Sequence, residues 1–162
     1  MQVNLLKFYP KSKRPIEERG NLITERDRAV ARKFDIEYFD GDRLTGNGGY
    51  SYHPKFWTET VAHMVDFYQL NNTSRVLDIG CAKGFMMHDL QLLLPEAEIL
   101  GVDVSQYAKD NAKNSIKDKI TVCNANNLPF KDNYFDLVLA INTLHNLPKI
   151  DCKEAFREIS RV

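Results

Sequence analysis

The middle of the chain contains a glycine turn and two acidic residues whose types and spacing suit the binding of a polar ligand. The turn Asp78-Ile-Gly80-Cys-Ala-Lys-Gly84 follows an apolar run, and its glycines allow the backbone to bend sharply and approach a ligand. The start of the helix expected after the turn offers free amide N–H groups. Asp103 ends the next apolar run, 19 residues after Gly84. A carboxylate at that place can accept two hydrogen bonds from a ribose diol.

The turn does not match the fingerprint of a dinucleotide site. That fingerprint has glycine at the first, third and sixth positions, whereas the positions counted from Gly80 hold Gly80, Ala82 and Phe85. Asp78, just before the turn, would repel a pyrophosphate and would suit an ammonium group. The residues therefore favour a ligand that carries positive charge.

The elements that must position these residues alternate between strands and helices from Ser74 onward. Short β-branched runs predict four strands, and periodic apolar residues predict three helices between and after them. Asp151 and Glu154 resemble a capping box at the start of the last helix. The order predicts an α/β fold with a parallel sheet and right-handed crossovers. The predicted strands are 75–79, 98–104, 119–123 and 134–141, and the helices are 84–94, 105–116 and 151–162.

The first 52 residues form a helical and loop-rich N-terminal extension in this prediction. A helix is expected over 24–39 with Thr24 as its cap, and residues 41–49, with four glycines, are expected to be irregular. Tyr50 or Tyr52 could close over the site as part of a lid. Residues 53–162 form the main domain, beginning with a helix over 53–70 that packs on it.

Composition and charge exclude several classes of protein. The 162 residues have room for one domain, and 22 basic and 22 acidic residues give zero net charge. No long-range field attracts nucleic acid or a membrane surface, and no apolar window is long enough to span a bilayer. Three widely spaced cysteines fit neither a disulfide framework nor a metal site. We therefore expect free thiols, no metal and a cytoplasmic location.

Several segments together resemble the ordered motifs of class I S-adenosylmethionine-dependent methyltransferases. The segments are VLDIGCAKGF, GVDVS, NANNLPFKDNYFDLV, INTLHN and FREISRV, all within residues 75–162. The resemblance implies a Rossmann-like open parallel sheet with helices on both faces. It also implies further strands after the fourth, so the chain is expected to be truncated and the sheet incomplete at its C-terminus.

The resemblance also implies a set of residues that bind S-adenosylmethionine. The glycine turn holds the methionyl part, Asp103 the ribose, and the loop after the third strand the adenine. Two positions depart from the usual pattern, with Ala82 in place of a glycine and Asn124 in place of an aspartate. Binding is expected to survive if the φ angle of Ala82 is negative. The implied cofactor residues are Asp78, Gly80, Cys81, Gly84, Asp103, Val104, Asn124, Ala125, Asn126 and Asn142.

His145 in INTLHN is the candidate general base, because the family places its acceptor-facing loop after the fourth strand. Its ordinary pKa of about 6.5 suits it to take a hydroxyl proton, although a structural or solvated histidine is an equal alternative. Residues 39–52 resemble a bacterial group associated with sugar or surface-polysaccharide synthesis, so the expected acceptor is a small molecule of that kind. A nucleic-acid methyltransferase and a non-catalytic binding module are the alternatives.

Overall fold

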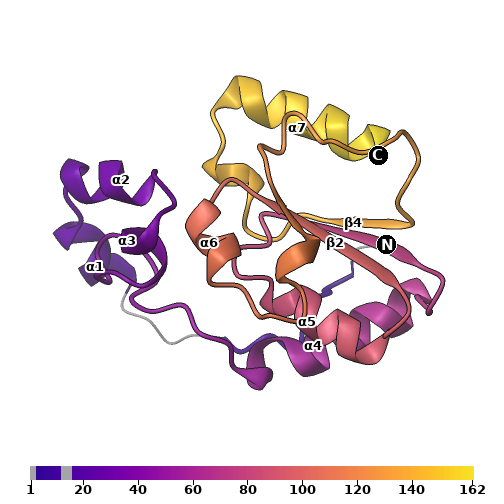
Figure 1. The fold of residues 1–162 in the computed structure, drawn as a ribbon. Coiled ribbons are helices and arrows are strands. Elements are labelled where there is room, and N and C mark those ends of the chain that lie inside the picture. Colours follow the sequence, from indigo (N-terminus) through magenta and orange to yellow (C-terminus); the bar gives the residue numbers. More distant parts are fainter. Residues whose placement is uncertain (1–2, 12–15) are drawn as a thin grey trace.

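A four-stranded parallel sheet forms the centre of the computed structural model, which describes residues 3–11 and 16–162 (Figure 1). The strands lie in the order β3-β2-β1-β4, so β1 pairs with β2 on one side and with β4 on the other. Strand order reverses at β1, which creates a crevice beyond the carboxyl ends of β1 and β4. The bounds are β1 Arg75–Ile79, β2 Glu98–Asp103, β3 Ile120–Val122 and β4 Leu137–Leu139.

Helices cover both faces of the sheet, as the resemblance implied. Side chains alternate along each strand, so Val76 faces one layer while Leu77 and Ile79 face the other. The Val76 layer packs against α4 (Pro54–Tyr68) and α5 (Phe85–Leu93). The Leu77 layer packs against α7 (Lys149–Arg161). This fold confirms the α/β, Rossmann-like prediction.

The single helix predicted over 24–39 is wrong, because the chain forms two helices there. α2 (Glu25–Ala31) begins at the predicted cap, where Thr24 and Asp27 form a complete capping box. The chain then turns at Phe34, whose φ angle of 50° lies in the left-handed region. Asp35 caps α3 (Ile36–Phe39) by accepting a hydrogen bond from the backbone N–H of Ile36. The apolar pattern continued through this break and so hid it.

Other predicted elements are shorter or begin elsewhere. The helix predicted over 105–116 is only α6 (Gln106–Asp110), because after Asn111 the helical bonds stop and the N–H of Ala112 donates to the carbonyl of Lys109, three residues back. The third and fourth strands are also shorter than predicted. The capping box at Asp151 is wrong, since α7 starts after Pro148 without a side-chain cap and Asp151 accepts from Asn126 Nδ2 instead.

The N-terminal extension divides into two parts that pack in different places. Leu5 and Leu6 pack on the core beside α4, and the ring of Tyr9 lies 5.0 Å from that of Trp57. Residues 16–50, which we call the N-terminal lobe, contain α1 (Ile16–Leu22), α2 and α3 and lie beside α6 (Figure 1). Within the described ranges no helix is long and apolar enough to cross a membrane.

Candidate functional site

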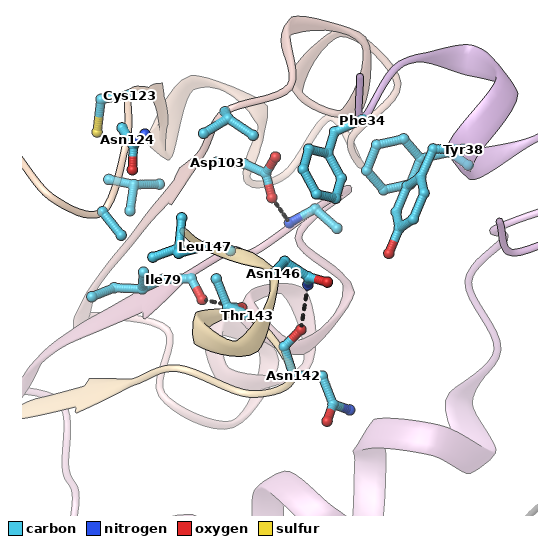
Figure 2. Close-up of a pocket in the computed structure, with 16 residues that line it drawn as sticks. Phe34, Tyr38, Ile79, Asp103, Cys123, Asn124, Asn142, Thr143, Asn146 and Leu147 are labelled. Carbon is cyan, nitrogen blue, oxygen red and sulfur yellow. Dashed lines mark hydrogen bonds between the residues drawn. The ribbon is translucent and has the colours of Figure 1, made fainter. Parts of the chain in front are cut away.

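A cavity lies at the carboxyl ends of the strands, between the sheet and the N-terminal lobe (Figure 2). The lobe contributes Phe34, Tyr38 and Phe39. The 3-10 helix η2 (Leu144–Asn146) and its neighbours close the opposite side. The lining from the sheet and its loops consists of Ile79, Gly80, Ala82, Val102, Asp103, Val104, Cys123, Asn124, Ala125, Asn142, Thr143, Asn146 and Leu147.

Gly80 is the residue that allows the turn after β1 to pass beneath η2. Its φ angle is 73°, and its N–H donates to the carbonyl of Val102 at 2.8 Å. A Cβ at this position would collide with the side chain of Thr143. That side chain is fixed, because Thr143 Oγ1 donates to the carbonyl of Ile79 at 2.9 Å. The sequence therefore needs glycine here for both conformation and space.

Ala82 does not have the negative φ angle on which the expected cofactor binding depended. Its φ angle is 51°, in the left-handed region that favours glycine. The turn keeps this strained conformation, and the backbone N–H of Ala82 donates to Asp103 Oδ2 at 2.7 Å (Figure 2). The strain therefore accompanies a contact that orients the carboxylate of the cavity wall.

Two buried carboxyl groups stand at this end of the sheet. Asp103 is held by two backbone donors, Ala82 to Oδ2 and Ser105 to Oδ1 at 2.9 Å. Burial raises the pKa of Asp103, and these backbone hydrogen bonds oppose the rise. Burial, and then the charge of Asp103, raise the pKa of Asp78 to about 7. A positively charged ligand would relieve the cost of ionising both groups.

Some of the predicted cofactor residues line the cavity, and others lie outside its lining. Gly80, Asp103, Val104, Asn124, Ala125 and Asn142 line the cavity, whereas four others do not. Cys81 is buried in the core, and Gly84 is the N-cap of α5 with Ile116 packed against it. Asn126 donates its Nδ2 to Asp151 at 3.0 Å. Asp78 is buried in β1, only two residues before Gly80.

His145 is not among the residues that line the cavity. It is exposed within η2, although Thr143 and Asn146 on either side of it are lining residues. The two tyrosines predicted for a lid are also outside the lining. Tyr50 stacks on Phe85 at 5.0 Å, and Tyr52 donates its hydroxyl to Asp89 at 2.6 Å.

Phe34 and Tyr38 are the lining residues that sequence reasoning missed most clearly. Figure 2 shows their rings beside Asp103, on the side of the cavity that the lobe covers. Tyr38 is half-buried, and burial followed by the charge of Asp103 raises the pKa of its hydroxyl. The available signal was the concentration of aromatic residues in FDIEYF, within an otherwise polar extension.

Comparison with known proteins agrees with this geometry. The methyltransferase domain family matches residues 77–162, more than half of the chain. Malonyl-[acyl-carrier protein] O-methyltransferase of Legionella pneumophila is 34% identical over 92 residues, which span 54% of this chain and 32% of that protein. This chain therefore spans about a third of that relative's length.

Two solved structures share the fold. A SAM-dependent methyltransferase from Aquifex aeolicus matches with a TM-score of 0.53 and 18% identity, covering 93% of this chain and 68% of that one. The [4+2]-cyclase SpnF matches with a TM-score of 0.59 and 23% identity, covering 77% and 45%. At these identities the likeness shows the fold alone. The family match and the cavity at the strand ends together identify the chain as a member of the methyltransferase domain family.

Proposed function

We propose that this chain binds S-adenosylmethionine in the cavity and transfers its methyl group to a small-molecule acceptor. The observation that carries the proposal is the buried carboxylate of Asp103 in the cavity wall, at the end of β2, with the buried carboxyl group of Asp78 in the neighbouring strand β1. S-adenosylmethionine carries a sulfonium and an ammonium group. Two buried acids, of which one has a pKa of about 7, suit a ligand with that charge.

The chemistry of the wall also fits the rest of the cofactor. Asp103 Oδ2 accepts the backbone N–H of Ala82 and Oδ1 that of Ser105, and a carboxylate has further lone pairs that could accept from a ribose hydroxyl. Asn124 and Ala125 offer polar and apolar contacts for an adenine ring. When bound, the cofactor supplies a methyl group that its positive sulfur has already activated. The protein then needs to hold the acceptor in line with it and to exclude water.

His145 is proposed as the base for a hydroxyl acceptor. Its imidazole, exposed on η2 in the same segment as the lining residues Thr143 and Asn146, would take the proton from the acceptor oxygen as that oxygen becomes nucleophilic. Asn142, whose own φ angle is 54°, lines the cavity nearby and would orient the acceptor. A sugar or surface-polysaccharide precursor is the acceptor that we propose, supported by the resemblance of residues 39–52. The three free cysteines support a reducing compartment such as the cytoplasm.

A His145→Ala variant distinguishes a hydroxyl acceptor from a carboxylate one. A sugar hydroxyl must lose its proton, so we expect kcat to fall about 100-fold or more while cofactor affinity stays the same. A carboxylate, as in the malonyl group named for the Legionella relative, is already ionised at neutral pH and needs no base. Equal kcat values for the variant and the parent would remove His145 from the mechanism.

A thermal-shift titration tests cofactor binding first. S-adenosylmethionine or S-adenosylhomocysteine at about 100 times its Kd should add about 2.7 kcal/mol to stability, or roughly 5–10 °C in Tm. NAD serves as the control ligand, and Asp103→Ala as the control variant that should lose the shift. A cooperatively folded protein that gives no shift with either adenosyl compound would contradict the proposal.

A further inference from the structure

A single carboxylate in the N-terminal lobe ties three separate parts of the chain together beside the cavity. Asp40 Oδ2 lies 2.6 Å from Lys83 Nζ and accepts the hydroxyl of Tyr107 at 2.6 Å. Asp40 Oδ1 accepts the backbone N–H of Tyr50 at 2.9 Å. Lys83 belongs to the glycine turn and Tyr107 to α6, so Asp40 links the lobe to both.

Lys83 is almost completely buried, which makes this ion pair different from those on the surface. Its side chain is 8% exposed, and that of Asp40 is 30% exposed. Lys83 Nζ also donates to the carbonyl of Tyr50 at 2.9 Å. Although burial opposes it, hydrogen bonds from Lys83 and Tyr107 hold the pKa of Asp40 below its ordinary value. Breaking one partner would leave a buried charge uncompensated, which is costly.

Aromatic packing holds together the same junction, by which we mean the contacts of Asp40 with Lys83 and Tyr107. The ring of Tyr50 stacks on Phe85, the first residue of α5, and Phe39 stacks on Tyr107 at 6.2 Å. Phe39 is buried and also lines the cavity. The residues that hold the lobe in place therefore adjoin the residues that form the cavity wall.

The turn that receives the lobe is the turn that shapes the site. Ala82, which orients the Asp103 carboxylate, immediately precedes Lys83 in the chain. Phe34 and Tyr38, which line the cavity, lie in the same lobe as Asp40. A displacement of the lobe would thus move both the aromatic wall and the turn that holds Asp103.

We propose that Asp40 is a positioning residue for methyl transfer: through Lys83 and Tyr107 it holds the N-terminal lobe so that Phe34 and Tyr38 enclose the bound cofactor. This proposal rests on the proposed function. The glycine turn contacts both Asp103 of the cavity, through Ala82, and Asp40 of the lobe, through Lys83. Cofactor binding and the position of the lobe are therefore linked reciprocally. A bound cofactor stabilises the docked lobe, and the docked lobe strengthens cofactor binding.

The test compares Asp40→Asn and Lys83→Met with a matched control in the same lobe. Glu25→Gln removes the exposed pair between Glu25 and Arg28, at 3.3 Å, and leaves the junction untouched. We expect each junction variant to weaken S-adenosylhomocysteine binding about tenfold or more, and the control to bind as the parent does. The double variant should lose no more than the larger single loss, because the two residues act through one contact.

Limited proteolysis supplies a readout that does not require turnover. In the parent, the glycine-containing segment 41–49 should be cut slowly, and more slowly still with S-adenosylhomocysteine. In Asp40→Asn, cleavage should be several-fold faster and the protection by the ligand should disappear, while Lys83→Arg should retain part of it.

The outcomes separate the two proposals. In one outcome the parent binds S-adenosylhomocysteine, and Asp40→Asn has the same affinity, the same cleavage rate and the same protection by the ligand. That outcome would overturn the positioning role and leave the proposed function intact. A parent that binds no adenosyl ligand would overturn the proposed function and, with it, the positioning role. Faster cleavage of Asp40→Asn would then show only that Asp40 anchors the lobe.

Discussion

The raised pKa of Asp78 leads to a prediction about how ligand binding depends on pH. Its pKa of about 7 is far above the ordinary value of 3.8, because burial and the nearby Asp103 both oppose its ionisation. A cationic ligand favours the ionised form and lowers this pKa, so binding at neutral pH must release protons.

We expect the affinity for S-adenosylmethionine to rise between about pH 6 and pH 8, as Asp78 becomes ionised before binding. Isothermal titration calorimetry in buffers of different ionisation enthalpy would measure the proton release directly. Asp78→Asn is the control, since its binding should be weaker and its pH dependence flatter. Parent affinity that does not change across this range would rule out the linkage.

The same group makes a prediction about stability without cofactor. A carboxyl whose pKa is higher in the folded state than in the unfolded state favours folding at low pH. That contribution is lost as pH rises from about 4 through 7. Asp78→Asn should therefore be more stable than the parent at pH 8, by about 4 kcal/mol, and similar at pH 4. Urea unfolding at the two pH values checks this, and a variant less stable at pH 8 would contradict it.

Ala82 carries the strain of the glycine turn. A non-glycine residue in the left-handed region costs about 1–2 kcal/mol, and the greater unfolded-state entropy of glycine offsets part of any gain. Ala82→Gly should raise stability by about 1 kcal/mol, or roughly 2–4 °C in Tm. Thermal unfolding measures it, with Ala62→Gly on α4 as a control that should lower Tm.

At the scale of elements, α7 positions the loop after β3, which contributes Asn124 and Ala125 to the cavity wall. Arg161 donates to the carbonyls of Leu128 and Phe130 at 3.0 and 2.7 Å, and to Asp132 at 2.9 Å. Glu158 pairs with Arg161 and accepts the N–H of Leu128 at 2.7 Å. The last helix therefore fixes the path of the chain after β3.

Arg161→Ala should lower the free energy of unfolding, because it leaves several acceptors of the loop without a donor. It should also weaken cofactor binding by displacing Asn124 and Ala125. Arg157→Ala removes an exposed pair with Glu154 on the same helix and should change stability by less than about 0.5 kcal/mol. Chemical unfolding of both variants makes the comparison, and equal losses would argue against the role of Arg161.

The elements could be predicted where the pattern was local. β1 begins and ends at the predicted residues because its four buried positions, Val76 to Ile79, lie between the polar residue Arg75 and Gly80. The fourth strand was predicted too long, since the backbone N–H groups of Tyr134 and Phe135 bond to Val162 rather than to the sheet. The break at Phe34 leaves no trace in apolar periodicity.

At the scale of the whole molecule, the strand-end residues of the site could be predicted and the lobe contacts could not. Asp103 and Gly80 follow from the rule that ligands bind at the carboxyl ends of parallel strands, and the family resemblance implied Asn124. Lys83 and Asp40 are 43 residues apart, and nothing in their local sequences indicates that they meet. Only the docking of the lobe on the turn creates that pair.

The central place of β1 has a consequence for the order in which the protein is made. β1 can pair with β2 early in synthesis, but its other neighbour, β4, pairs through Val76 and Leu137 and emerges much later. Such distant parallel pairing forms slowly. Before β4 pairs with β1, the crevice between these two strands is open on the β4 side. We therefore expect a nascent chain to gain its ligand affinity only after β4 has paired with β1, which makes that affinity a marker of this pairing.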